Sequence, residues 1–145
     1  MGCLWYRVQA GDADLASFFY ELGARSGRRR TPLPAFTPEY RGGEAAFARR
    51  FIRELTPRRR RPWAFVLDDL HQVASPQPLL AVLGDALEEL PPWARAILVS
   101  RVQPPATLAR LIASGVMSVV GGEELRRRPV DTSPAPGTAS MRAAT

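Results

Sequence analysis

The sequence predicts an α/β protein with a mostly parallel sheet and helices on both faces of that sheet. Short apolar runs alternate along the chain with segments whose apolar residues recur at helical spacing. The runs are predominantly apolar, which is typical of strands buried on both faces. The chain has 145 residues, of which 46% are hydrophobic, so one domain with a substantial core is expected.

The first part of the chain predicts a strand and two helices. Residues 3–10, "CLWYRVQA", are rich in aromatic and β-branched residues and predict the strand. Asp14 is placed to cap the first helix, whose apolar face would be Leu15, Phe18, Phe19 and Leu22. A second helix is predicted over residues 43–55. Its buried stripe would be Phe47, Phe51, Ile52 and Leu55.

The remaining elements alternate strictly. Strands are predicted at residues 63–67, 94–100 and 116–120, with helices at 78–90 and 105–114 between them. From residue 126 the chain loses periodicity and becomes rich in Pro, Ser, Thr and Ala. We therefore expect one domain over residues 1–125 and a disordered tail over residues 126–145.

Composition excludes several classes of protein. The net charge is +6, and all 20 basic residues are arginine. A phosphate-binding loop of the form G-x-x-x-x-G-K-[ST] needs its lysine, so this chain does not contain that loop in its usual form. Cys3 is the one cysteine and forms no internal disulfide, which fits a reducing cytosol. No apolar run reaches the length of a membrane span, so a cytoplasmic protein is expected.

Two of the predicted strands end in charged residues. The run "FVLDD" ends in Asp68 and Asp69, and the run "ILVSR" ends in Arg101. With the flanking stretches "LWYRVQAGDADLASFFYEL" and "VVGGEELR", this order resembles the nucleotide-binding domain of the STAND class of P-loop NTPases. The resemblance extends to large LuxR-type bacterial transcriptional regulators similar to the maltose-regulon activator, and it covers residues 4–126.

The resemblance implies a role for each of these residues. "FVLDD" matches the Walker B strand, so Asp68 would hold Mg²⁺ through water and Asp69 would help to polarise the attacking water. "ILVSR" matches the sensor strand, so Arg101 would contact the terminal phosphate of ATP. The family's phosphate-binding loop precedes this region, and its DNA-reading helix-turn-helix follows it. We therefore expect an interior fragment of such a regulator, without independent ATPase activity.

Other interpretations remain open at this stage. The two aspartates could cap the turn after the strand, and Arg101 could be a solvated surface residue. His71 has no cysteine or second histidine nearby, so a zinc site is not expected. The arginine runs at residues 28–30, 58–61 and 126–128 could make the chain a small nucleic-acid-associated protein. However, no aromatic residues interleave with these runs, so only weak, non-specific binding is expected. The chain could also be a non-functional remnant of a larger gene.

The resemblance also predicts that one strand has an unpaired edge. In this class of NTPase, the strand that carries the phosphate-binding loop lies between the sensor strand and the last strand. We therefore expect residues 94–100 to have one unpaired edge, unless the strand at 116–120 moves in beside them. An unpaired apolar edge favours self-association, or pairing with the missing N-terminal segment.

Overall fold

A computed structural model describes residues 2–27, 32–57, 62–73, 78–127 and 141–144. The strands are β1 (Gly2–Arg7), β2 (Trp63–Asp68), β3 (Ala94–Val99), β4 (Met117–Val120) and β5 (Met141–Ala144). They form one sheet in the order β1-β2-β3-β5-β4, and every neighbouring pair is parallel. The α/β class and the parallel pairing of β1, β2 and β3 are therefore confirmed.

The helices are α1 (Leu15–Arg25), α2 (Glu44–Leu55), α3 (Pro78–Leu87), α4 (Ala109–Ala113) and α5 (Gly122–Arg127). Four of the described helices, α1 to α4, lie close to their predicted positions, and α5 was not predicted. Short 3-10 turns include η1 (Ala10–Ala13), η2 (Pro38–Tyr40), η3 (Leu70–Val73) and η4 (Ala106–Leu108). Asp14 caps α1 as predicted, because its carboxylate accepts a hydrogen bond from the backbone N–H of Ser17.

The main core lies between the sheet and the helices. Phe19 of α1 contacts Phe47 and Phe51 of α2, with both pairs of ring centroids 4.9 Å apart. Phe36 and Tyr40, from the segment between the two helices, pack against Phe47. The predicted apolar faces of both helices are buried, namely Leu15, Phe18, Phe19 and Leu22 on α1 and Phe47, Phe51, Ile52 and Leu55 on α2.

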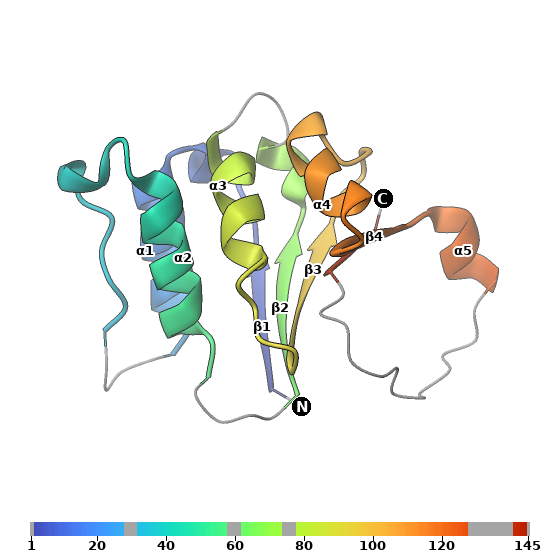
Figure 1. Ribbon diagram of the computed structural model, residues 1–145, viewed down its shortest axis with the longest axis horizontal. Coiled ribbons are helices and arrows are strands. Elements are labelled where there is room, and N and C mark those ends of the chain that lie inside the picture. Colours follow the sequence, from blue (N-terminus) through green and yellow to red (C-terminus); the bar gives the residue numbers. More distant parts are fainter. Residues whose placement is uncertain (1, 28–31, 58–61, 74–77, 128–140, 145) are drawn as a thin grey trace.

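The sequence predicts helices on both faces of the sheet, but in the described part of the chain no helix covers the second face. In Figure 1, α3 and α4 lie in front of the strands, and α1 and α2 stand to the left of β1. The strands β1, β2 and β3 follow one another across the sheet in a single direction. Right-handed crossovers then place the connecting helices on the same side. A second covered face needs a reversal of direction, which these three strands do not make.

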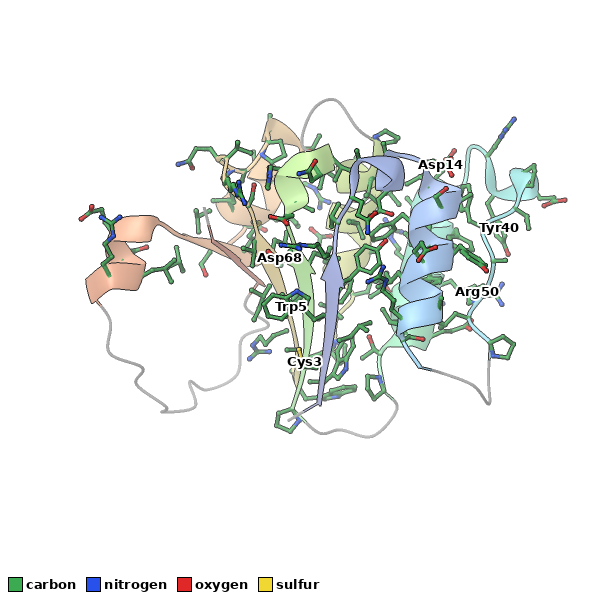
Figure 2. The ribbon with its side chains drawn as sticks, turned by 180° about the vertical axis from the view of Figure 1, so that it is seen from behind. Cys3, Trp5, Asp14, Tyr40, Arg50 and Asp68 are labelled. Atoms are coloured by element: carbon green, nitrogen blue, oxygen red, sulfur yellow. The ribbon has the colours of Figure 1, made fainter. Side chains whose placement is uncertain are left out.

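The opposite face of β1 is consequently exposed. Tyr6 points into the core and is 1% exposed, whereas its neighbour Trp5 is 59% exposed. Cys3 is exposed as well. Figure 2, which views the sheet from behind, shows Cys3 and Trp5 on the side away from α2 and α3.

The C-terminal region contains two elements that the sequence analysis did not predict. Residues 122–127 form α5, and residues 141–144 form the strand β5. The disorder expected for residues 126–145 stays a prediction. Residues 128–140 and 145 lie outside the described residues. The second edge of β3 is not unpaired, because Ile97, Leu98 and Val99 pair with residues 142–144. The last predicted strand, β4, lies on the far side of β5 rather than beside β3.

Candidate functional site

The candidate site lies where the parallel strands β1, β2 and β3 end. Arg7 ends β1 and pairs in register with Asp68, which ends β2. Ser100 and Arg101 follow directly after β3, whose Leu98 pairs with Leu67. Since parallel strands present their carboxyl ends at one edge of the sheet, Asp68 and Arg101 belong to the same edge. In open α/β sheets, this is the edge at which ligands bind.

Asp68 is half-buried and held by the backbone around it. Its carbonyl oxygen accepts a hydrogen bond of 2.8 Å from the N–H of Val8. Its Oδ1 accepts one of 2.9 Å from the N–H of Asp69. No donor in the described part of the chain contacts its Oδ2. The carboxylate is thus fixed in place with one oxygen open, which fits a ligand that holds Mg²⁺ through water.

Asp69 is engaged differently from its neighbour. Its backbone is left-handed, with φ at 57°, which aspartate tolerates better than most residues. Its Oδ2 accepts a hydrogen bond of 2.9 Å from Nε of Arg7, on the neighbouring strand β1. Arg7 therefore engages one oxygen of Asp69, and the implied role of polarising a water molecule would fall to the other oxygen, Oδ1.

The sequence analysis did not predict a role for Arg7, although Arg7 forms the ion pair with Asp69. It is a charged residue near the end of a predicted strand, which is a common place for solvent-exposed arginine. The contact depends on the register between β1 and β2, in which Arg7 pairs with Asp68. The register of parallel strands joined through two helices cannot be read from the sequence of either strand.

His71 lies in η3, immediately after the two aspartates. Its Nδ1 is 3.9 Å from Oδ1 of Asp69, beyond hydrogen-bond distance. Among the described residues, this nitrogen is buried and has no hydrogen-bond partner. Within the described ranges, His, Cys, Asp and Glu side chains nowhere gather in a group of three or more that could hold a metal ion.

Arg101 is exposed at the bend that follows β3. The bend is held by Ser100, whose hydroxyl accepts a hydrogen bond of 3.2 Å from the N–H of Val102. Arg101 forms no ion pair with any other described residue, in contrast to Arg7. Its guanidinium is therefore available to a ligand at this edge.

A second polar cluster, which the sequence analysis did not predict, lies inside the core near β1. The hydroxyl of Tyr6 donates a hydrogen bond of 2.8 Å to Oδ1 of Asp12, and the N–H of Gln9 donates one of 2.8 Å to Oδ2. Burial, and then the hydrogen bond to Asp12, raise the pKa of the Tyr6 hydroxyl well above its ordinary value. The guanidinium of Arg25 lies 5.3 Å from the centre of the Tyr6 ring. These contacts join β1, η1 and α1, so their role is structural.

The structure describes only part of one of the three arginine runs, residues 126 and 127. Residues 28–30 and 58–61 lie outside the described residues, as does residue 128. Arg126 forms an ion pair of 3.6 Å with Glu123 on α5. No helix in the described part of the chain has both the length and the apolar character that crossing a membrane requires.

Comparisons with known proteins do not assign this chain to a family. No family model matches the sequence, and no match is found among curated proteins or among solved structures. What the fold and the site define is an α/β protein with a parallel sheet and charged residues at its carboxyl edge.

Proposed function

We propose that this chain carries the magnesium-binding acid and the phosphate-sensing arginine of a nucleotide-dependent switch domain of the STAND class. The regulator to which it would belong is of the LuxR type. The observation that carries the proposal is that Asp68 ends β2 and Arg101 comes just after the neighbouring parallel strand β3, at the same edge of the sheet. One residue suits Mg²⁺ and the other suits phosphate, and a nucleotide with its metal ion presents both.

The order of the strands supports the same proposal. In STAND domains, the strand that carries the phosphate-binding loop lies between the sensor strand and the last strand. Here β3 would be the sensor strand and β4 the last strand, and they are separated by the width of one strand.

Each residue has a role that follows from its surroundings. The open oxygen of Asp68 would hold a water ligand of Mg²⁺, and Arg101 would fork onto oxygens of the terminal phosphate. Mg²⁺, when bound, neutralises charge on the phosphates of ATP. Asp69 is the proposed catalytic carboxylate, which would help to polarise the attacking water. It would act through Oδ1, because its Oδ2 accepts the hydrogen bond from Arg7.

The chain by itself is not expected to hydrolyse ATP. Catalysis of phosphoryl transfer depends on holding the terminal phosphate in place, and the family's loop does this with a lysine that these residues do not include. We expect no ATP turnover above background by the purified chain. Turnover that disappears in Asp68→Asn would contradict this expectation.

The roles of Asp68 and Arg101 are tested by supplying the loop. An N-terminal extension that contains a strand and a G-x-x-x-x-G-K-[ST] loop is fused to the chain, and binding of Mg²⁺-ATP is measured by calorimetry. Asp68→Asn and Arg101→Ala should each weaken binding at least tenfold. The control variants are Asp85→Asn on α3 and Arg53→Ala on α2, which should bind as the parent does. Binding that is equal in all four variants would refute the proposal.

A further inference from the structure

His71 lies beside the two aspartates of the candidate site but has no role in the proposed function. It belongs to η3, in which Leu70 and Val73 are buried, with 4% and 1% of their surfaces exposed. The N–H of Gln72 donates a hydrogen bond of 3.0 Å to the carbonyl oxygen of Asp69, which closes the turn. The two buried side chains and the closed turn therefore fix the backbone of His71 relative to Asp69.

The imidazole ring of His71 has a buried nitrogen that needs a partner. Its Nδ1 has no hydrogen bond within the part of the chain that the structure describes. A buried polar atom without a partner costs free energy, so native proteins seldom contain one without a reason. Oδ1 of Asp69 lies 3.9 Å from this nitrogen, and the two side chains are only 19% and 20% exposed. A movement of about 1 Å would bring the pair to hydrogen-bond distance.

The other nitrogen of the ring indicates where the proton lies. Nε2 of His71 is 3.4 Å from Nε2 of Gln72. An amide nitrogen donates and does not accept, so this contact is a hydrogen bond when Nε2 of His71 is the acceptor. The neutral ring then carries its proton on Nδ1, which is the nitrogen beside Asp69.

We propose that His71 is a positioning residue that donates a hydrogen bond from Nδ1 to Oδ1 of Asp69. Arg7 already donates to Oδ2, so the carboxylate would be held at both oxygens. A carboxylate oxygen has two lone pairs, and Oδ1 keeps one for the water that Asp69 would polarise. Hydrogen bonds of catalytic groups are often long in the free protein and tighten when substrate binds, which fits the distance of 3.9 Å. The effect on the water rests on the proposed function, whereas the hydrogen bond does not.

The first test needs no nucleotide and uses the chain as it is. His71 is the one histidine in the sequence, so labelled histidine gives a single set of ring-nitrogen signals in proton–nitrogen NMR spectra. We expect the neutral ring to be mainly the Nδ1–H tautomer. Asp69→Asn, which suits the left-handed backbone at this position, should lower the ratio of Nδ1–H to Nε2–H about fivefold. Asp85→Asn on α3 is the control and should leave the ratio unchanged.

Either of two results would overturn the hydrogen bond. One is a neutral ring that is mainly the Nε2–H tautomer, since Nδ1 would then have no proton to donate. The other is a tautomer ratio that Asp69→Asn does not change, since the carboxylate would then have no influence on His71.

The second test separates positioning from a structural role. The chain is fused to the N-terminal extension with the G-x-x-x-x-G-K-[ST] loop, and hydrolysis of Mg²⁺-ATP is measured. The amide nitrogen of asparagine can take the place of Nδ1, and that of glutamine the place of Nε2. His71→Gln should therefore lower kcat about tenfold with KM unchanged, whereas His71→Asn should stay within about threefold of the parent.

The outcomes distinguish this inference from the proposed function. Equal losses of kcat in His71→Gln and His71→Asn, or a loss that appears in KM, would overturn the positioning role. A fused parent that does not hydrolyse ATP would instead count against the proposed function, and the tautomer of His71 would then decide the hydrogen bond by itself.

Discussion

Removal of one hydroxyl from the core should measurably weaken the fold. Tyr6→Phe keeps the ring, which packs edge-on against Phe18 with centroids 5.6 Å apart. It removes the hydrogen bond to Asp12, whose side chain belongs to a residue that is 4% exposed. Oδ1 of Asp12 would then be buried without a donor, while Oδ2 keeps its bond from Gln9.

The magnitude follows from the charge on the acceptor. A hydrogen bond to a charged group contributes about 1.5–3 kcal/mol, and leaving a buried polar atom unsatisfied costs a similar amount. We therefore expect Tyr6→Phe to lower the free energy of unfolding at pH 7 by about 2 kcal/mol. Tyr20 provides the control, because it is 73% exposed on α1, and Tyr20→Phe should change stability by less than about 0.5 kcal/mol.

Burial of the Tyr6 hydroxyl, together with its bond to Asp12, makes stability depend on pH in the alkaline range. The folded pKa of Tyr6 is raised, so the folded protein keeps a proton that the unfolded chain releases above its pKa of about 10. The stabilisation from Tyr6 is complete below about pH 10 and is lost as pH rises from there towards the folded pKa. Ionisation of the unfolded tyrosine accounts for a loss of about 1.4 kcal/mol at pH 11. Tyr6→Phe should not show this part of the loss.

Urea unfolding followed by circular dichroism at pH 7, 9 and 11 measures both effects. The wild type, Tyr6→Phe and Tyr20→Phe are compared at each pH. If the two variants are equally stable at pH 7, the hydroxyl of Tyr6 is not bonded as the structure places it. If the wild type and Tyr6→Phe lose the same stability between pH 9 and pH 11, the raised pKa of Tyr6 is wrong.

Three further predictions concern the core, a helix cap and the charge. Phe51→Ala should lower the free energy of unfolding by about 3–5 kcal/mol, because Phe51 is fully buried against Phe19. Phe36 is only partly buried, so Phe36→Ala should lower the free energy of unfolding clearly less, and equal losses would contradict the packing. Asp14→Ala should cost about 1 kcal/mol at pH 7 in thermal unfolding, and Asp14→Asn much less. The hydrogen bonds from Ser17 lower the pKa of Asp14, so the difference from wild type should shrink as pH falls below about 4, and a constant difference would exclude the charge of the Asp14 carboxylate as part of its source. Binding to duplex DNA should be weak, indifferent to sequence and lost as salt rises to physiological concentration, and a selective complex that survives such salt would favour a nucleic-acid-associated protein instead.

The local elements could be predicted because each depends on residues close together in the sequence. The apolar face of α1, its cap at Asp14 and the stripe of α2 need only helical spacing and one side-chain acceptor. The apolar runs at β2 and β3 have few alternatives to a buried strand. The parallel pairing of β1, β2 and β3 then follows from the helices between them.

The features that could not be predicted depend on register and on distant partners. The pairing of Arg7 with Asp69 needs the register of β1 against β2, and the buried bond between Tyr6 and Asp12 needs the position of η1. β5 could not be predicted because "MRAA" has low strand propensity. Its position depends on pairing with both β3 and β4, which are distant in the sequence. The one-sided arrangement of α2, α3 and α4 follows from handedness and strand order, which no single segment encodes.

The exposed thiol of Cys3 makes the uncovered face of the sheet open to spectroscopy. Cys3 is the one cysteine in the sequence, so a maleimide dye attaches to a single known position without any engineering. Trp5 is two residues further along the same strand, and alternation places both side chains on the same face. Indole quenches many dyes on contact, so the emission of the labelled chain reports the freedom of the tryptophan ring. Any molecule that covers this face, whether a helix, a surfactant or a second chain, would separate or trap the two groups and change the brightness of the dye.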